Sequence, residues 1–471
     1  MARKSEVINF PHTRADVYPT EPQEELGRTL RARHVSMIAI GGIIGAGLFV
    51  GSSTSIATAG PAVVLSYILA GTLVLLVMRM LSEMAVSIPG VQSFPEFARH
   101  GLGNWGGFLS GWLYWYFWVV VVAIEAIAGA VILQNWIDLP TWLIGVGLMA
   151  VLTTVNLAST RFYGEFEFWF SSLKVAAIIA FIAIVGGYVF GLAPADTPTF
   201  SNLFIHGGFA PNGGTAVLAA TTSVIFSLVG AEIATIAAAE SAEPNKVVAR
   251  LTSTVALRIL VFYILSVALI VCAVPWTQIV PGVSPFATAL DAIAIPGAAT
   301  IMNLVVLVAV LSCLNSGLYV TSRVLFTLAA NGDAPQALVS VNRRKVPVRS
   351  ILVASVFSYV ALAASIISPQ VVFSFLVNAS GALMLIVYLM IAVSQIRLRR
   401  RHERTAPELL TLRMWFFPWL SYVTAGAIVL ILLAMALTPD LAPQFYASLG
   451  ATVVAMIGYW LVYRKRATVP K

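Results

Sequence analysis

The chain has 471 residues, of which 59% are hydrophobic and only 10% are charged. A soluble domain carries about 25% charged residues because its surface faces water, so this composition excludes an ordinary soluble protein. The formal net charge of +8 could suggest a nucleic-acid partner, but the basic residues are placed as in a membrane protein. We therefore expect an all-α integral membrane protein that has no nucleic-acid partner.

About twelve apolar segments follow one another along the chain. The first two share the uncharged run 35–78 and are divided near Gly60 and Pro61. The others lie near 108–133, 142–157, 166–190, 215–239, 255–274, 298–329, 351–367, 371–394, 415–437 and 445–462. With tilt or flanking interfacial residues, each can cover a hydrocarbon core of about 30 Å. The sequence therefore predicts a bundle of about twelve transmembrane helices.

The basic residues of the predicted loops all fall on one side of the membrane. If the N-terminus is cytoplasmic, the inner side receives the basic residues at 28–33, 99, 161, 246–250, 343–345, 397–404 and 464–466. The outer loops, near positions 138, 196, 291 and 440, contain no Lys or Arg. This distribution is the positive-inside pattern. We expect a multi-pass protein of the cell (inner or plasma) membrane with both termini in the cytoplasm.

The first predicted span contains four glycines in the seven residues from Gly41 to Gly47. Each glycine weakens a helix by up to about 1 kcal/mol relative to alanine. An unwound turn here would expose free N–H groups at the N-terminus of a half-helix, which suits a carboxylate. From this run alone, close helix packing through small residues is the simpler interpretation. A dinucleotide-binding loop is not expected, because no strand–turn–helix unit surrounds the glycines.

The sixth span contains a second interruption of small and polar residues, between Phe226 and Glu232. The first and sixth spans correspond if the chain consists of two inverted five-helix halves followed by two extra helices. Paired interruptions at matching places favour a ligand site between the halves. We accordingly expect a tail at 1–33, a first repeat at 34–194, a second repeat at 195–396, and the last two helices with a C-terminal tail at 397–471.

Several stretches resemble a known family. They are RHVSMIAIGGIIGAGLFVGSS at 33–53, MRMLSEMAV at 78–86, YGEFEFWFSSLKV at 163–175, GAEIATIAAAES at 230–241, SCLNSGLYVTSR at 312–323 and NGDAP at 331–335. In this order they resemble bacterial amino acid permeases of the amino acid–polyamine–organocation superfamily, most closely the γ-aminobutyrate (GABA) permeases. The resemblance implies a LeuT-like fold with broken first and sixth helices, alternating access and proton-coupled uptake of GABA or a related ω-amino acid. One departure is Gln92, where family members often have glycine.

The resemblance also implies a substrate site at the two interruptions. Backbone N–H groups of the first span would bind the substrate carboxylate, at Ile43, Ile44, Gly45, Ala46 and Gly47. Carbonyl groups around Phe226 and Ser227, beside Gly230, would take the ammonium group, and Phe226 would close the site as an aromatic lid. The chemistry agrees, because N–H groups attract anions and carbonyl groups attract cations.

Ionisable residues inside the spans are candidates for proton coupling. The resemblance implies that Lys174 stands where sodium-coupled relatives hold a cation, so that its proton could bias the inner gate; the alternative is a lysine that snorkels to the interface. Glu125 could meet the substrate ammonium or make a structural hydrogen bond between helices. All five histidines lie outside the spans. We expect no cofactor or metal, with the proton as the coupling ion.

Further polar residues are gating or structural candidates. Salt bridges at Glu83, Arg79 and Arg323 could hold the inner gate shut, although solvated interfacial charges are the simpler account. Glu232 is expected to tie the broken sixth helix to a neighbour. The eighth span contributes polar residues that could line the first span near Lys174 or make packing contacts, namely Asn315, Ser316 and Tyr319.

Two further groups of side chains are interpreted without a direct function. The aromatic cluster at 112–118 is interpreted as an interfacial belt rather than a cofactor box. Cys272 and Cys313, the two cysteines, are interpreted as small core residues.

Other functions remain open to different degrees. An enzyme would need a clustered nucleophile, metal ligands or a His–carboxylate set within the membrane, and an ATP-driven pump would need a P-loop; the sequence has neither. A channel would show rings of charge or a selectivity loop. The nearest alternative is the same fold importing an aromatic, basic or neutral amino acid, followed by an amino acid exchanger. We expect a small amino acid and membrane lipid as partners, and a monomer or weak homodimer.

Overall fold

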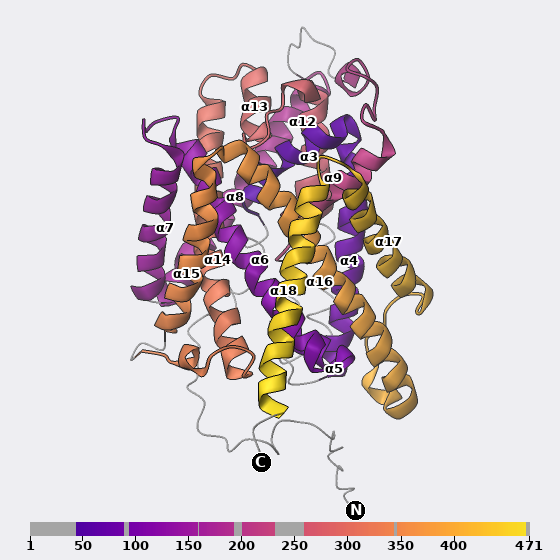
Figure 1. Cartoon of the computed structure of the whole chain (residues 1–471). Coiled ribbons are helices and arrows are strands. Elements are labelled where there is room, and N and C mark those ends of the chain that lie inside the picture. Colours follow the sequence, from indigo (N-terminus) through magenta and orange to yellow (C-terminus); the bar gives the residue numbers. More distant parts are fainter. Residues whose placement is uncertain are drawn as a thin grey trace, which may run out of the picture.

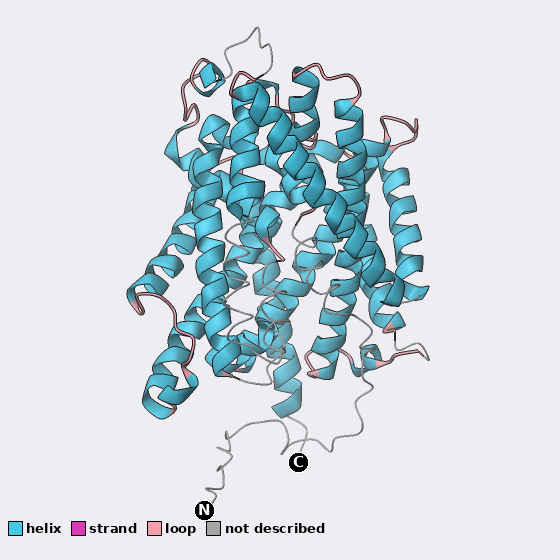
Figure 2. Ribbon diagram, turned by 180° about the vertical axis from the view of Figure 1, so that it is seen from behind, coloured by secondary structure: helices cyan, strands magenta, loops and turns pink. Residues whose placement is uncertain are grey.

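The computed structural model describes residues 44–88, 94–158, 160–192, 200–230, 259–342 and 346–467. These residues form helices joined by short loops, and none of them forms a strand (Figures 1 and 2). An apolar chain in lipid must satisfy its own backbone N–H and C=O groups, and a helix does so within one segment. The all-α fold class predicted from composition is confirmed.

The first half of the chain contains the predicted spans one to five. The first span consists of α2 (Ala46–Phe49) and α3 (Gly51–Ala59). It is followed by α4 (Val63–Ser87), a short helix α5 (Phe94–Leu102), α6 (Asn104–Leu133), α7 (Thr141–Ala158) and α8 (Thr160–Val189). Gly60 divides α3 from α4 with a φ of 63°, the left-handed region that favours glycine. The predicted boundary between the first two spans is therefore confirmed.

The second half contains the remaining spans. They are α9 (Gly213–Leu228), the π-helical η4 (Ile259–Leu265) with α12 (Ser266–Ala273), α14 (Ala298–Ala330), α15 (Val348–Ala363), α16 (Pro369–Thr405), α17 (Trp419–Leu437) and α18 (Ala442–Ala467). A further short helix, α13 (Pro285–Ala292), precedes α14. Within the described residues, eight helical stretches are long and apolar enough to cross a membrane, and three shorter apolar helices accompany them. Each of the predicted spans overlaps described helix, although parts of the first, sixth and seventh lie outside the described residues. The repeat boundaries stay a prediction.

The helices differ in how deeply they lie in the bundle. In α6 the apolar window is 83% buried by the rest of the chain, whereas in α18 it is only 6% buried. Figure 1 shows α6 passing diagonally behind α18, and α6 contacts α14, α15, α16 and α18. Most residues of α6 therefore face protein, while most of α18 faces outward.

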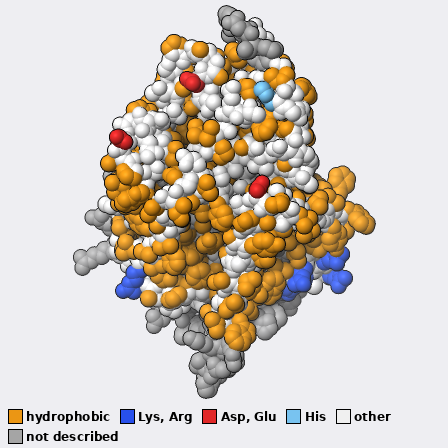
Figure 3. All heavy atoms as spheres, turned by 45° about the horizontal axis from the view of Figure 1, so that its top comes forward, with side chains coloured by type: hydrophobic (Ala, Val, Ile, Leu, Met, Phe, Trp, Pro, Cys, Tyr) orange, Lys and Arg blue, Asp and Glu red, His pale blue; other side chains and the backbone are white. Residues whose placement is uncertain are grey.

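Charged side chains separate the two ends of the bundle. Figure 3 shows acidic side chains and a histidine toward one end, while Lys and Arg gather toward the other. We call the second end the basic end; its exposed arginines include Arg349, Arg397, Arg400 and Arg413. The acidic residues of the opposite end include the exposed Asp138, Asp291 and Asp440. This separation agrees with the predicted orientation.

Candidate functional site

The first helix break lies at Gly45. Helix α2 begins at Ala46, and Gly45 precedes it in an extended conformation, with φ −136° and ψ −153° and no side-chain cap. Ile44 is fully buried beside it. The first helical N–H groups therefore point toward the interior of the bundle, as predicted. Ile43, the remaining predicted residue of this break, lies outside the described part of the chain.

The second break lies at the end of α9. The helix stops at Leu228, Val229 is extended with φ −64° and ψ 146°, and Gly230 has a φ of 112°, which favours glycine. Glu232 lies outside the described residues, and its role as a tie to a neighbouring helix stays a prediction. The chain thus leaves the helix after Leu228, within the interruption predicted between Phe226 and Glu232.

A close backbone contact joins the two breaks. The hydroxyl of Ser227 donates to the backbone oxygen of Gly47 at 2.6 Å. A Cβ atom on Gly47 would lie only 2.7 Å from the Cα of Ser227, so a larger residue would force the two segments apart. The predicted carboxylate-binding and ammonium-binding segments are therefore in direct contact.

Glu125 reaches the first break from α6. Its carboxylate is 1% exposed, and both of its oxygens accept from the backbone N–H of Ala46 at 3.1 Å. A Cβ atom on Gly45 would meet the same carboxylate at 2.8 Å and the Cys313 sulfur at 2.7 Å. The sequence left open a structural hydrogen bond or a place in the cavity for Glu125. Glu125 does both in the structure: it makes a hydrogen bond between α6 and α2, and it lines a cavity.

The cavity lies between the two breaks and has a volume of about 20 Å³. Predicted site residues form part of its wall, namely Gly45, Gly47, Glu125, Phe226 and Ser227. Other lining residues were not predicted, namely Phe117, Trp118, Val121, Val229 and Cys313. A space of this size holds about one water molecule. An amino acid can therefore enter only if lining side chains move.

The unpredicted residues of α6 share a helix face with Glu125. Phe117, Trp118 and Val121 precede it by eight, seven and four positions, which is the spacing of one face. The interfacial-belt interpretation is wrong for most of the cluster at 112–118, because Trp118 is 2% and Trp115 5% exposed, while Tyr116 is 43% exposed. Counting back from Glu125 in steps of a helical turn would have found the cavity-lining residues.

Lys174 on α8 is fully buried, and its ammonium group donates to the hydroxyl of Ser312 at 2.9 Å. The snorkelling alternative is therefore wrong for this lysine. The next residue after Ser312 is Cys313, which was interpreted only as a core residue; its thiol hydrogen-bonds to Glu125. Lys174 and Glu125 are thus connected through two neighbouring residues of α14. The coupling role of Lys174 stays a prediction.

The remaining candidates of α14 contact one another or α7. Asn315 accepts from the side-chain amide of Asn156 on α7 at 2.8 Å, which is a packing contact. The guanidinium of Arg323 lies over the ring of Tyr319 at 3.7 Å and donates to the hydroxyl of Ser322 at 2.8 Å. Tyr319 and Arg323 lie in the second half of α14 (Ala298–Ala330), which runs toward the basic end, and their gating role stays a prediction.

Glu83 on α4 has a different environment from the one favoured by the sequence. It is 1% exposed and accepts from Arg399 and from Gln395, both on α16 and both at 3.0 Å, and also from the N–H of Met414. The interpretation as a solvated charge is therefore wrong for Glu83. Arg79, one turn earlier, is half-buried and donates to the backbone oxygen of Arg413.

The chain is similar to known proteins along most of its length. The amino acid permease family pattern matches residues 34–471. The gamma-aminobutyric acid permease of Bacillus subtilis is 48% identical over 448 residues, 95% of each chain. The aromatic amino acid transport protein AroP of Corynebacterium glutamicum is 38% identical over 418 residues, 87% of this chain and 90% of that one.

Solved structures share the fold at low sequence identity. A manganese transporter of Eremococcus coleocola, in a mutant form, superimposes with a TM-score of 0.54 at 13% identity. The match covers 92% of this chain and 93% of that one. At this identity the likeness supports the arrangement of helices and carries nothing about the ligand.

Proposed function

We propose that this chain, which belongs to the amino acid permease family and is an amino acid transporter, imports GABA or a related ω-amino acid together with protons. GABA is supported by the relatives, because the Bacillus subtilis GABA permease is 48% identical and the Corynebacterium glutamicum aromatic amino acid transporter 38%. The relatives are named as transporters rather than enzymes. The site therefore has to bind and release its substrate without changing it.

The substrate carboxylate would bind at the start of α2. The observation that carries this proposal is that the Glu125 carboxylate already accepts from the Ala46 N–H at 3.1 Å, in a cavity shared by both helix breaks. An N–H group at a helix start that binds one carboxylate is suited to another. The substrate would therefore displace Glu125 from Ala46 and take over its hydrogen bond.

The substrate ammonium would lie on the opposite wall of the cavity. The last turn of α9, which ends at Leu228, includes the carbonyl groups of Phe226 and Ser227, and a helix C-terminus attracts a cation. The rings of Phe117, Trp118 and Phe226 line the same space and can each bind an ammonium group through their faces. An ω-amino acid, whose charges are further apart than those of an α-amino acid, could reach both walls at once.

Protonation of Glu125 would couple the proton to the substrate. A protonated carboxyl group accepts a hydrogen bond more weakly than a carboxylate, so it releases the Ala46 N–H more readily. Substrate binding and protonation would then favour each other. Protonation would also remove the attraction between the Glu125 carboxylate and the charge of Lys174, whose ammonium group donates to Ser312, the residue before Cys313. In this scheme Glu125 exchanges the proton and Lys174 biases the gate.

The direction of transport follows from the predicted orientation. The basic end would face the cytoplasm, as the positive-inside pattern requires. Opening to either side would alternate by movement of the two broken spans around the fixed site. The contact between Ser227 and Gly47 would hold the two breaks together during this movement.

Uptake by purified protein in proteoliposomes tests substrate and coupling together. Labelled GABA is offered with an inward proton gradient, with no gradient, and in the presence of an excess of other ω-amino acids or of aromatic, basic or neutral amino acids. We expect accumulation only with the gradient, and competition by ω-amino acids rather than by aromatic ones. Competition by aromatic amino acids alone would reassign the substrate.

Two further outcomes separate other mechanisms. Uptake that needs an amino acid inside the vesicle, whatever the gradient, would identify an exchanger. Flux that does not saturate and shows no counterflow would identify a channel, because a carrier must return through its site in each cycle.

A further inference from the structure

The α6 side of the cavity between the two breaks consists mainly of apolar side chains. In the proposed function, backbone groups of α2 and α9 bind the two charges of the substrate. Every amino acid carries these charges, so the backbone groups alone do not discriminate between amino acids by size. Selection by size therefore depends on side chains that face the carbon chain of the substrate. On α6 these are Phe117, Trp118 and Val121.

Trp118 has the largest of these three side chains, and its ring is packed against three neighbours. The side chain is only 2% exposed. Its ring lies edge-to-face with the rings of Tyr114 and Phe117, at centroid distances of 6.2 Å and 5.7 Å. The third neighbour is Gly317 of α14, where an added Cβ atom would lie 3.8 Å from the indole ring. A ring packed in this way moves only if its neighbours move as well.

The helix backbone that carries Trp118 is held by two other helices. The carbonyl group of Val119, the next residue, accepts from the hydroxyl of Ser358 on α15 at 3.1 Å. On the α14 side, a Cβ atom on Gly317 would lie only 2.8 Å from the side chain of Val122, so α6 and α14 are in close contact there. The middle of α6 is therefore fixed between α14 and α15.

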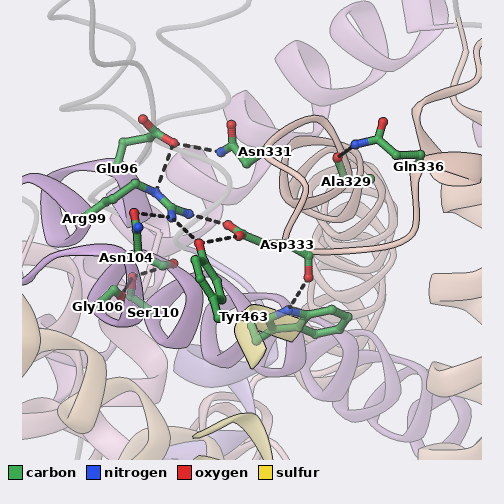
Figure 4. Close-up of polar contacts among 12 residues, drawn as sticks. Glu96, Arg99, Asn104, Gly106, Ser110, Ala329, Asn331, Asp333, Gln336 and Tyr463 are labelled. Atoms are coloured by element: carbon green, nitrogen blue, oxygen red, sulfur yellow. Dashed lines mark hydrogen bonds and ion pairs between the residues drawn. The ribbon is translucent and has the colours of Figure 1, made fainter. Parts of the chain in front are cut away.

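The first part of α6 is tied to a polar network at the basic end of the bundle. The indole N–H of Trp112 donates to the backbone oxygen of Asp333 at 3.2 Å. Figure 4 shows that the Asp333 carboxylate forms an ion pair with Arg99 of α5 and contacts the hydroxyl of Tyr463 on α18. Helix α6 cannot shift away from the cavity without breaking these contacts. A larger substrate therefore has to displace the Trp118 ring itself.

We propose that Trp118 determines which ω-amino acids the transporter accepts, because its ring occupies the space that a large substituent on the carbon chain of the substrate needs. This inference rests on the proposed function, in which an ω-amino acid reaches both helix breaks. An unbranched chain of CH₂ groups needs only a narrow space between its charged ends. Displacement of Glu125 from Ala46 and movement of Phe226 provide that space while Trp118 stays in place. A substituent of the size of a ring collides with the indole.

The proposal predicts what the loss of the indole ring does to the cavity. Trp118→Leu extends the cavity toward Tyr114 and Gly317, against which the ring packs. The indole N–H makes no hydrogen bond with the residues that the structure describes, so the substitution leaves no acceptor among them unpaired. In another protein, an engineered apolar cavity of about 150 Å³ binds benzene. The enlarged site should accordingly accept a phenyl group.

Two substrates that differ by a single ring test this proposal. Uptake of GABA and of β-phenyl-GABA, which has the same charges at the same separation, is measured with the full chain in proteoliposomes. We expect the wild type to prefer GABA by about 100-fold in kcat/KM. Trp118→Leu should reduce this preference by about 30-fold, because it loses contacts with GABA and makes room for the phenyl group. Trp118→Phe, which removes less of the side chain, should reduce it by about threefold.

Trp115→Leu is the matched control for Trp118→Leu. Trp115 lies three positions earlier on α6, is 5% exposed and makes edge-to-face contacts with Trp112 and Phe357, but it does not line the cavity. This variant should keep the preference of the wild type, even where the loss of a buried ring slows its uptake of both compounds. A change in preference therefore reports on the substrate site, whereas an equal loss for both substrates reports on folding.

The outcomes separate this inference from the proposed function. A wild type that takes up both compounds equally, a Trp118→Leu variant with unchanged preference, or an equal change in Trp115→Leu would overturn the role of Trp118 and leave GABA transport intact. A wild type that transports neither compound would overturn the proposed function itself. If Trp118→Leu does not yield folded protein, Trp118→Phe decides, and an unchanged preference in that variant overturns the role of Trp118.

Discussion

Glu83 and Glu125 are both 1% exposed, but their partners differ in number and kind. Glu83 accepts from a guanidinium, a side-chain amide and a backbone N–H, with Arg399 neutralising its charge at 3.0 Å. Glu125 accepts from the N–H of Ala46 and from the weakly donating thiol of Cys313, at the wall of a cavity. One carboxylate has its counter-charge in contact, and the other does not.

This difference separates a structural acid from one that is able to act. A buried ion pair costs several kcal/mol when one partner is removed, so the region around Glu83 should be fixed. A buried carboxylate held by neutral donors can take up a proton or exchange its partner more easily. The two carboxylates are equally buried, so their hydrogen-bond and ion-pair partners distinguish them. Glu83 holds α4 to α16, whereas Glu125 belongs to the site between α2 and α9.

The largest expected effect comes from the contact between the breaks. Gly47→Ala should reduce uptake by about 100-fold, because its Cβ would lie 2.7 Å from the Cα of Ser227 and displace one break from the other. Initial rates of labelled substrate uptake measure this loss. Gly426→Ala on α17, where a Cβ meets nothing within 4 Å, is the control and should transport normally. A fully active Gly47→Ala variant would show that the contact is not needed.

Glu83 tests the structural side of the comparison. Glu83→Gln should lower the free energy of unfolding by about 2 kcal/mol, because it removes the buried counter-charge of Arg399 and leaves only the more exposed Glu403. Thermal unfolding in detergent measures the loss, and the pH dependence of transport in the surviving protein should be unchanged. The double variant Glu83→Met with Arg399→Met should recover part of the stability. If Glu83→Gln alone abolished proton coupling, the two carboxylates would not differ as stated.

Glu125 tests the functional side. Substrate affinity of the wild type should increase as pH falls, by up to about tenfold per pH unit, because protonated Glu125 releases Ala46. Glu125→Gln should bind substrate with an affinity independent of pH and should fail to accumulate it against a gradient. Equilibrium binding at several pH values and gradient-driven uptake measure the two effects. Unaltered pH dependence in Glu125→Gln would remove it from the site.

The smallest expected effect concerns the connection to Lys174. Ser312→Ala removes one acceptor of the Lys174 ammonium and should reduce proton-driven uptake by about threefold, with counterflow less affected. Thr321→Val on the same helix is the control, because this buried hydroxyl donates to Gly317 of its own helix. Equal losses in the two variants would indicate a general effect on α14 rather than one on coupling.

The sequence predicts where helices begin and end better than it predicts which side of each helix is buried. The lengths of the apolar segments alone located the spans. The glycines at 41–47 located the start of α2, because glycine disfavours helix. A helix that is apolar all around carries no such signal for its orientation. Trp118 was accordingly assigned to the membrane interface, although α6 passes through the centre of the bundle and Trp118 is buried.

Contacts between residues far apart in the sequence could not be predicted from the sequence for a similar reason. Glu125 and Ala46 are 79 residues apart, and Ser227 and Gly47 are 180 apart. Their types suggest hydrogen bonding, but only the arrangement of α2, α6 and α9 decides the partners. In the same way, the charge of Glu83 suggested solvent until α16 and the segment at Met414 were placed around it.

The hydrogen bond between Glu125 and Ala46 also bears on the return of the empty carrier. If substrate release left a backbone N–H without an acceptor, the empty carrier would have to bury this unpaired donor when it returns. That burial costs free energy and would slow the return step. Here the protein supplies a stand-in acceptor from its own α6. Under the proposed mechanism the Ala46 N–H would have an acceptor both with and without substrate, which favours a symporter that returns empty over an exchanger.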